Sequence, residues 1–365
     1  MKYPALMPIA EVLPGLDAYD SIIDVRSPSE FAEDHIPGAI NCPVLDDAER
    51  AEIGTLYKQV SPFDAKKKGA ALVSRNIGHH LEHTLIDKPR DWKPLIYCWR
   101  GGNRSGAMAH VLARVGWPAV QLDGGYKEYR RQVNLLLAEL PARLRFIVVC
   151  GTTGSGKSRL LQTLARHGAQ VLDLEQLAAH RGSVLGHLPS EPQPSQKMFE
   201  SRLWQALRHL DAARPVYIES ESKKVGNLRV PEALMERMRA SECVSVQLSQ
   251  QDRVQLLMED YAHFVDAPAA LNKQLDCLVT RYGKEAIGRW QQMALQNEMA
   301  PLVEELLAEH YDPAYLKSIE RNFSRYGEAS VLEIAGVSAE AFDEAATRLL
   351  ADVGQDCHTL PNVKP

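Results

Sequence analysis

The chain has 365 residues, of which 45% are hydrophobic and 24% charged, as in ordinary soluble globular proteins. A net charge of −5 excludes the global basic field expected of a nonspecific nucleic-acid binder. No apolar run approaches the roughly 20 residues of a membrane span, and the proline-broken start of the chain lacks a signal-peptide pattern. Six cysteines without a CxxC pair argue against a disulfide framework and against a zinc site. We therefore expect a cytoplasmic protein of two domains that makes no membrane contact.

The first part of the sequence alternates short apolar runs with helical patterns. We expect strands at 20–25, after a turn at 35–41, at 95–97 and at 119–122. Ser27 followed by Pro28 predicts a helix start, and residues 46–88 and 105–115 have helical patterns. Strands that alternate with helices predict a parallel sheet, and therefore an α/β domain over residues 1–138.

A second α/β domain is expected over residues 145–355, after a linker at 139–144. Its predicted strands are 145–150, 171–174, 215–219 and 243–248, with a helix at 157–167. From about residue 252 to 350 the pattern is mainly helical, which predicts a helical C-terminal region. We expect residues 356–365 to be a disordered tail.

The strand at 145–150 leads into a complete phosphate-binding P-loop, Gly151-x-x-x-x-Gly156-Lys157-Ser158. In such a loop the backbone N–H groups and the N-terminus of the next helix bind phosphate oxygens. Lys157 supplies a positive charge, and Ser158 can ligate Mg²⁺. We expect no other metal site and no tightly bound cofactor. The predicted phosphate-binding residues of the loop are Gly151, Gly154, Ser155, Gly156, Lys157 and Ser158.

Several charged residues are candidate partners of the P-loop. Asp173 follows the second predicted strand of this domain, whereas Glu219 ends the third and Glu221 follows it. Acids at the carboxyl ends of parallel strands face the ligand crevice, although a helix cap or a surface charge explains each of them equally well. Arg181 and Lys223 are candidate phosphate clamps, with ordinary surface charge as the alternative.

A second strand-loop-helix unit carries a cysteine. Cys98 directly follows the strand at 95–97, and the loop runs through Gly101 and Gly102 to Arg104, where a helix begins. Inward-pointing N–H groups and a helix N-terminus stabilise a thiolate, and Arg100 and Arg104 add positive charge. We therefore predict that Cys98, Arg100 and Arg104 form a catalytic site.

The cysteine loop and its surroundings resemble the rhodanese (sulfurtransferase) domain, in which the cysteine takes up sulfur as a persulfide. The resemblance rests on Asp24-Val25-Arg26, on His35-Ile36-Pro37-Gly38-Ala39, on Leu122-Asp123-Gly124-Gly125-Tyr126 and on Cys98. The usual rhodanese loop is Cys-x-x-Gly-x-Arg-Ser, and here it is one residue longer. Cys-x5-Arg-Ser is the spacing of protein tyrosine phosphatases, so the loop could accept a tetrahedral oxyanion or an atom larger than sulfur.

The whole chain resembles the tRNA 2-selenouridine synthase family. The segments that carry the resemblance are Cys98–Ser105, Gly151–Ser158, Asp173-Leu174-Glu175, His180-Arg181-Gly182-Ser183 and Tyr217–Ser222. The resemblance implies a rhodanese-like domain fused to a P-loop NTPase-like domain. It also implies an enzyme, a transferase, that replaces the sulfur of wobble 2-thiouridine in tRNA with selenium from selenophosphate. The family also attaches a geranyl group to that sulfur, using geranyl diphosphate.

This resemblance gives each loop an expected task. The P-loop would hold the diphosphate of geranyl diphosphate, and the Cys98 loop would serve the selenium step, because two arginines suit an anionic selenophosphate. Cys98 would carry selenium as a selenosulfide or act directly on the geranylated base. The flipped uridine would stack on an aromatic such as Trp99, which is equally well explained as a packing residue. The basic residues expected to bind the anticodon stem-loop are Arg253, Arg281, Lys284, Arg289, Lys317, Arg321 and Arg325.

Two other functions remain open. A phosphatase-like or sulfurtransferase rhodanese domain fused to a nucleotide kinase-like domain would explain both loops, although Tyr97 rather than His precedes Cys98. A nonenzymatic regulator that binds tRNA or nucleotide would retain its function after Cys98→Ala. The sequence carries no signal of oligomeric state, and a monomer is our working expectation.

Overall fold

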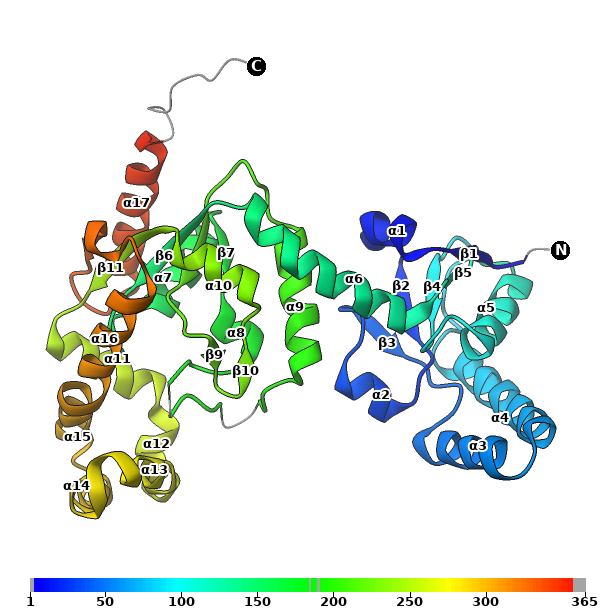
Figure 1. Cartoon of the computed structure of the whole chain (residues 1–365), viewed down its shortest axis with the longest axis horizontal. Helices are drawn as coiled ribbons and strands as arrows, with labels where there is room; N and C mark the ends of the chain where they lie inside the picture. Colours follow the sequence, from blue (N-terminus) through cyan, green and yellow to red (C-terminus); the bar gives the residue numbers. More distant parts are fainter. Residues whose placement is uncertain (1–2, 184, 189–190, 357–365) are drawn as a thin grey trace. The chain divides into compact units, whose positions relative to one another are not determined.

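The computed structural model describes residues 3–183, 185–188 and 191–356 of the chain. It contains two compact units, formed by residues 1–136 with 194–205 and by residues 137–193 with 206–365. The division falls within helices α6 (Gly125–Glu139) and α9 (Gln196–Arg208) (Figure 1). Of the tail predicted to be disordered, Asp356 ends helix α17, and residues 357–365 lie outside the described residues.

A parallel sheet of five strands forms the centre of the first unit. Its order is β1-β5-β4-β2-β3, and every pairing within it is parallel, as predicted. All four residues of the inner strand β4 are buried, because helices cover a parallel sheet on both faces. The strands are β1 (Ala5–Met7), β2 (Ser21–Asp24), β3 (Ala39–Asn41), β4 (Pro94–Tyr97) and β5 (Val120–Leu122).

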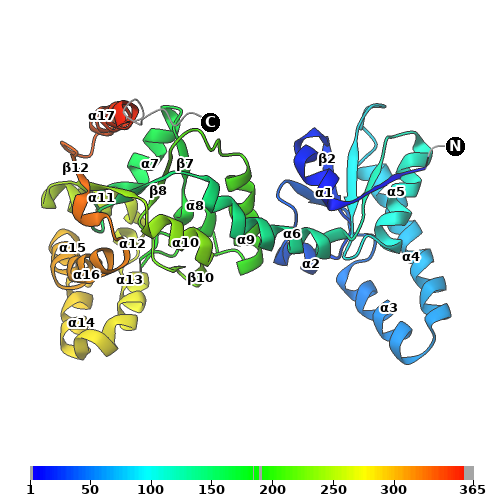
Figure 2. The ribbon, with the colours of Figure 1, turned by 45° about the horizontal axis from the view of Figure 1, so that its top comes forward.

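Several helices of the first unit begin at residues that cap a helix N-terminus. Ser27 and Glu30 form a capping box at the start of α2, with Pro28 in the first turn as predicted. Helices α3 and α4 occupy the predicted helical stretch and form a hairpin (Figure 2). The helical segments up to α6 are α1 (Ile9–Val12), η1 (Leu13–Ala18), α2 (Pro28–Glu33), α3 (Asp47–Gln59), α4 (Pro62–His83) and α5 (Asn103–Val115).

The second unit contains another parallel five-stranded sheet, in the order β12-β11-β6-β8-β7. Four of its strands were predicted. The edge strand β12 was not, because it lies in a region whose pattern is mainly helical. A short antiparallel pair, β9 with β10, follows β8. The strands are β6 (Phe146–Cys150), β7 (Gln170–Leu172), β8 (Val216–Glu219), β9 (Lys224–Val225), β10 (Leu228–Arg229), β11 (Glu242–Gln247) and β12 (Ser330–Glu333).

Helices of the second unit pack around this sheet and build a helical region with its own core. That core includes Trp290, Leu302 and Leu275, all buried. Within the described part of the chain, no helix is both long and apolar enough to cross a membrane. The helical segments are η2 (Leu140–Arg143), α7 (Lys157–Arg166), α8 (Leu174–Ala178), α10 (Glu232–Arg239), α11 (Gln250–Asp260), α12 (Ala262–Asp266), α13 (Pro268–Leu275), η3 (Asp276–Leu278), α14 (Val279–Leu295), α15 (Met299–Leu306), η4 (Leu307–Tyr311), α16 (Asp312–Asn322), η5 (Tyr326–Glu328) and α17 (Ala339–Asp356).

Candidate functional site

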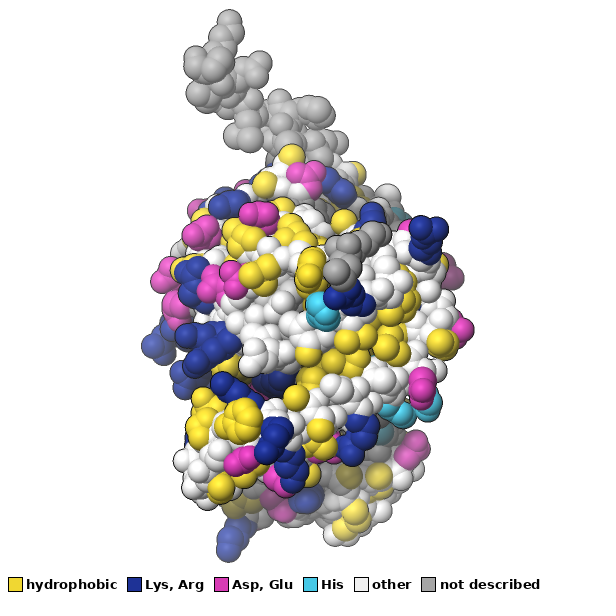
Figure 3. All heavy atoms as spheres, turned by 90° about the vertical axis from the view of Figure 1, so that its right-hand side faces the viewer, with side chains coloured by type: hydrophobic (Ala, Val, Ile, Leu, Met, Phe, Trp, Pro, Cys, Tyr) yellow, Lys and Arg dark blue, Asp and Glu magenta, His cyan; other side chains and the backbone are white. Residues whose placement is uncertain are grey.

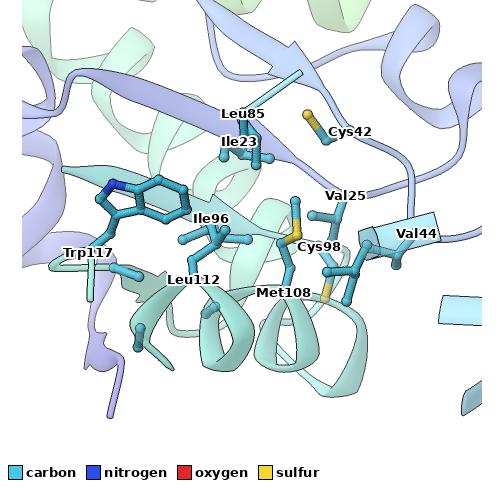
Figure 4. Packing of buried hydrophobic residues seen from close by; sticks show 14 of the residues in the cluster. Ile23, Val25, Cys42, Val44, Leu85, Ile96, Cys98, Met108, Leu112 and Trp117 are labelled. Carbon is cyan, nitrogen blue, oxygen red and sulfur yellow. The ribbon is translucent and has the colours of Figure 1, made fainter. Parts of the chain in front are cut away.

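Cys98 lies at the carboxyl end of β4, where the strand leads into the loop before α5. Its side chain is buried at 4% exposure and belongs to a core cluster that also contains Val25 and Met108 (Figure 4). The Ser105 hydroxyl, in the first turn of α5, donates a hydrogen bond to Cys98 Sγ at 3.2 Å. The sulfur therefore lies beside a hydroxyl donor and near the N-terminus of α5.

The Cys98 loop is fixed by the turn that begins α6. Tyr126 N–H donates to the Cys98 carbonyl at 2.8 Å, and the side-chain amide of Gln121 donates to the Gly101 carbonyl at 2.6 Å. A Cβ at Gly125 would lie 2.2 Å from the Cys98 carbonyl oxygen, so only glycine permits this approach. The Asp123-Gly124-Gly125 motif therefore serves to hold the cysteine loop.

The two arginines of the loop differ in their surroundings. Arg104 donates to the Glu30 carboxylate at 3.0 Å, whereas the Arg100 side chain is exposed. Burial opposes the ionisation of Glu30, but the hydrogen bond and charge of Arg104 lower its pKa overall. Trp99 is 38% exposed, and its ring centroid is 5.3 Å from that of Tyr126. An anion at this loop would therefore meet the exposed charge of Arg100 and the partly neutralised charge of Arg104.

A buried ion pair lies beneath the loop. Arg26 is 1% exposed and donates to both carboxylate oxygens of Asp24, at 2.6–3.0 Å, and to the Asp34 carbonyl. Its guanidinium lies 3.9 Å from the ring centroid of Tyr126, whose hydroxyl donates to the Asp34 carboxylate at 2.7 Å. This network joins β2 to the turn that holds Cys98, so its role is to position the loop.

Figure 3 shows one face of the molecule, on which Lys and Arg side chains gather in several places among acidic and hydrophobic ones. Acidic side chains interrupt the basic ones on the face drawn there. This mixed surface agrees with the net charge of −5.

The P-loop lies between β6 and α7, as predicted, and its lysine binds the loop itself. Lys157 Nζ donates to the Gly151 carbonyl at 2.6 Å and to the Thr152 carbonyl at 3.3 Å. Gly156 has φ +84°, and a Cβ there would lie 2.7 Å from the Phe342 ring, so the position requires glycine. A ligand phosphate would have to replace the carbonyl contacts of Lys157.

Two more groups shape the same loop. The Tyr315 hydroxyl accepts a hydrogen bond from Gly151 N–H at 2.7 Å and lies 2.9 Å from the Ser220 hydroxyl. The Ser155 hydroxyl oxygen is buried, and it has no hydrogen-bond partner among the described residues. A phosphate oxygen is the kind of acceptor that such a hydroxyl lacks.

Buried and partly buried acids surround Lys157 and Ser158. The Ser158 hydroxyl donates to the Glu175 carboxylate at 2.8 Å, and Glu175 N–H donates to the Glu219 carboxylate at 2.9 Å. Glu175 and Glu221 line the cleft at the loop, whereas Asp173 accepts from Gln176 N–H at 2.7 Å and caps α8. Asp173 therefore makes the contact of a helix cap, which was the alternative to a role at the ligand.

The pKa values of Lys157 and of the neighbouring acids are shifted from their usual values. Burial, reinforced by the Glu175 charge, raises the pKa of Glu221 to about 8, although Lys157 opposes this. Burial and the neighbouring acids also raise the pKa of Glu219 well above its usual range. Burial lowers the pKa of Lys157, and the Glu175 and Glu221 charges oppose that change. A diphosphate at Lys157 would therefore meet a Glu221 side chain that is largely neutral at pH 7.

The cleft at the P-loop has a volume of about 730 Å³ and contains several cations. Arg181 lies 3.6 Å from Asp260 and 5.2 Å from the Tyr261 ring centroid, and it lines the cleft. Lys223 also lines it and pairs with Glu232 at 3.2 Å, with both side chains exposed. The other cations of the cleft are Lys157, Arg159, Lys224, Arg239 and Arg281. The structure thus brings both predicted clamps to the rim of one cleft.

The basic residues predicted to bind tRNA separate into two groups. Arg253 is 9% exposed, pairs with Asp312 at 2.6 Å and donates to the Thr153 carbonyl at 2.7 Å, so its prediction as a phosphate contact is wrong. Arg289 pairs with Glu305, and Arg325 with Glu328. The remaining candidates, Arg281, Lys284, Lys317 and Arg321, have exposed side chains.

A group of three or more His, Cys, Asp or Glu residues arranged to hold a metal ion does not occur among the residues that the structure describes. Ser158 and Glu175 nevertheless present adjacent oxygen atoms at the phosphate site, which are ligands of the type that Mg²⁺ prefers.

Sequence reasoning missed the residues that support the two loops from a distance. Glu175 could have been found from the sequence, because it lies three residues beyond the end of β7, where side chains face the ligand crevice. Glu30, Gln121, Arg253 and Tyr315 had no such signal, because each comes from an element far away in the sequence.

The chain matches two family models and many known proteins. Residues 9–132 match the rhodanese-like domain, and residues 144–277 match the tRNA 2-selenouridine synthase AAA domain. A tRNA 2-selenouridine synthase from Nitrosomonas europaea is 32% identical over 345 residues, with 82% of this chain and 89% of the relative covered. Another from Alcanivorax borkumensis is 34% identical over 330 residues, with 80% and 88% covered.

Among solved structures, a rhodanese-related protein from Thermoplasma volcanium is 22% identical, with 36% of this chain and 93% of that chain covered and a TM-score of 0.24. The predicted fold is confirmed: a rhodanese domain is followed by a P-loop-type AAA domain. With relatives this similar over most of its length, the chain belongs to the tRNA 2-selenouridine synthase family.

Proposed function

We propose that this enzyme converts wobble 2-thiouridine of tRNA to 2-selenouridine in the cytoplasm, through an S-geranylated base. The observation that carries the proposal is the presence of two different strand-loop-helix anion sites on one chain. One presents the Cys98 thiol, and the other presents Lys157 near Glu221, whose pKa is raised to about 8 by burial. Exposed Lys284, Lys317 and Arg321 are the proposed contacts to tRNA phosphates.

The first proposed step is geranyl transfer at the P-loop. The sulfur of 2-thiouridine attacks the allylic carbon of geranyl diphosphate and forms a C–S bond. The C–O bond to the diphosphate breaks, its electron pair leaves with the diphosphate, and the base loses its N3 proton. Lys157 and the loop N–H groups stabilise the charge that develops on the leaving diphosphate. Mg²⁺ bound by Ser158 and Glu175 would neutralise part of the same charge.

The second proposed step exchanges the alkylated sulfur for selenium at the Cys98 loop. Selenium in selenophosphate is already at the oxidation level of selenide, so a selenosulfide on Cys98 would require a two-electron oxidant. A route without an oxidant starts with attack of the Cys98 thiolate on phosphorus. An S–P bond forms, the Se–P bond breaks, and selenide leaves and takes up a proton.

The released selenide then attacks C2 of the alkylated base, and the geranyl thiolate leaves with its bonding electron pair. Water hydrolyses the S–P bond and returns phosphate and free Cys98. The Cys-x5-Arg-Ser spacing and the Ser105–Cys98 hydrogen bond support this route, because the hydroxyl stabilises the sulfur as attacking and as leaving thiolate.

The test measures 2-thiouridine tRNA by nucleoside mass spectrometry after treatment with geranyl diphosphate, selenophosphate or both. We expect Lys157→Ala to lose geranylation. We expect Cys98→Ser to accumulate the geranylated base and to lose selenium incorporation, whereas the buried Cys42→Ser serves as a matched control with both steps intact. An S-phosphocysteine adduct on the intact protein in selenophosphate would support the route proposed for Cys98.

A wild-type enzyme that modifies no tRNA while it hydrolyses an aryl phosphate would replace this proposal with the phosphatase-like function. Retention of both steps in Cys98→Ser would instead indicate a thiol without a catalytic role.

A further inference from the structure

A second cavity adjoins the P-loop cleft, and its walls are almost entirely apolar. Its volume is about 70 Å³, and most of its lining residues come from α11, α12, α13, α15 and η4, in the helical region of the second unit. Its apolar walls include Leu257, Phe264, Leu271, Met299, Leu302 and Val303.

The apolar cavity and the phosphate cleft meet at shared residues. Thr153 of the P-loop, Ser183, Leu257, Tyr261 and Tyr311 line both. The Ser183 and Tyr261 hydroxyls lie 3.3 Å apart, and Arg181 lies over the Tyr261 ring. The polar atoms of the shared wall thus gather near the phosphate site, and the far wall is hydrocarbon.

Packing alone does not explain a cavity of this kind. Protein interiors are normally close-packed, and side chains that line an unfilled apolar space lose dispersion contacts. The residues around it belong to the core cluster of Trp290 and Leu275, so the sequence could have filled the space with larger side chains. Apolar walls with a few polar groups at the mouth are typical of a small-molecule site.

We propose that this cavity binds the hydrocarbon tail of an allylic diphosphate whose diphosphate lies on the P-loop. The proposal rests on the proposed function, which places that diphosphate at Lys157, and it adds a tail site that contributes affinity and selects for an apolar group. Thr153 lies at the junction, where its carbonyl is held by Arg253 at 2.7 Å, so the loop wall between head and tail sites is fixed.

The test compares inorganic diphosphate with geranyl diphosphate by titration calorimetry on the full chain. Burial of a methylene group contributes about 0.8 kcal/mol, so even a partly buried tail should tighten binding by roughly a hundredfold or more. Val303 lines the cavity from α15 and is half-buried, so Val303→Trp should fill part of the space. We expect this variant to bind geranyl diphosphate at least about tenfold more weakly, with unchanged affinity for inorganic diphosphate.

Val331→Trp makes the same exchange at an exposed valine of β12 and should change neither affinity. If Val303→Trp unfolds, Val303→Thr keeps the shape and adds a hydroxyl to the apolar wall. It should still weaken only the tailed ligand, by severalfold.

The outcomes separate this inference from the proposed function. Equal wild-type affinities for the two ligands, or equal losses of both in Val303→Trp, would overturn the tail site while diphosphate still binds. If neither ligand depends on Lys157, the assignment of the P-loop to a diphosphate is itself wrong.

Discussion

The Cys98 loop and the P-loop share a strand-loop-helix plan and both have supported backbones, but their functional side chains differ in the contacts that they already make. The backbone of the Cys98 loop is fixed by Gln121 and Tyr126, and its thiol already accepts a hydrogen bond from Ser105. In the P-loop, Lys157 binds the loop's own carbonyls. The comparison teaches that similar loops differ in preorganisation. Other elements support both backbones, but the P-loop also needs a lysine that exchanges its present partners for a ligand.

The largest effect should follow from breaking the support of the first loop. Arg26→Ala leaves the buried Asp24 carboxylate without its cation, and loss of one partner of a buried pair costs about 3–5 kcal/mol. We expect urea unfolding, followed through the first unit, to report a decrease of this size. Arg131→Ala, which breaks an exposed pair with Glu128, should change the unfolding midpoint little. Equal effects of the two substitutions would contradict the supporting role of the buried pair.

The next largest effect should follow from removal of Lys157, the positive charge of the P-loop. Lys157→Ala should lower the rate of geranyl transfer by roughly 10²–10³-fold, as does the loss of one transition-state donor in other enzymes. Lys223→Ala removes a lysine from the rim of the same cleft and should cost less, because that side chain is exposed and paired with Glu232. Single-turnover kinetics of tRNA alkylation compare the two. A larger loss in Lys223→Ala would move the leaving-group contact away from the P-loop.

The sequence predicted both loops and every strand of the two sheets except the edge strands β1 and β12, because the predicted parts depend on local patterns. Apolar strands followed by glycine-rich turns and helix starts are readable from neighbouring residues. The supports were not readable, since Arg253 and Tyr315 reach the P-loop from about 100 and 164 positions away. Only packing decides which of many arginines or tyrosines arrives there. The same reason explains why Arg253 was mistaken for a tRNA contact, and why β12 was not separated from its helical surroundings.

A smaller effect should come from the hydroxyl that contacts the thiol. Ser105→Ala removes the hydrogen bond to Cys98 Sγ, and a bond to a charged group contributes about 1.5–3 kcal/mol. We expect selenium incorporation to slow by roughly tenfold or more, with geranyl transfer unchanged. Ser105→Thr keeps the hydroxyl and should retain most of the activity. If Ser105→Ala slows both steps alike, the serine acts on the fold rather than on the thiol.

The smallest effect is a pH dependence that should occur at the second loop. The pKa of Glu221 is raised to about 8, so its carboxyl is neutral at pH 7 and ionises as the pH rises through 8. The new negative charge opposes a diphosphate on Lys157, so affinity for inorganic diphosphate should decline severalfold between pH 7 and 9. The native state holds this proton more tightly than the unfolded chain does. Between about pH 4.5 and 8 the carboxyl ionises in the unfolded chain and stays protonated in the native state, so the free energy of unfolding falls as the pH rises. Glu221→Gln cannot ionise and should flatten the decline in affinity, whereas an unchanged pH profile in that variant would assign the titration to another acid of the cluster.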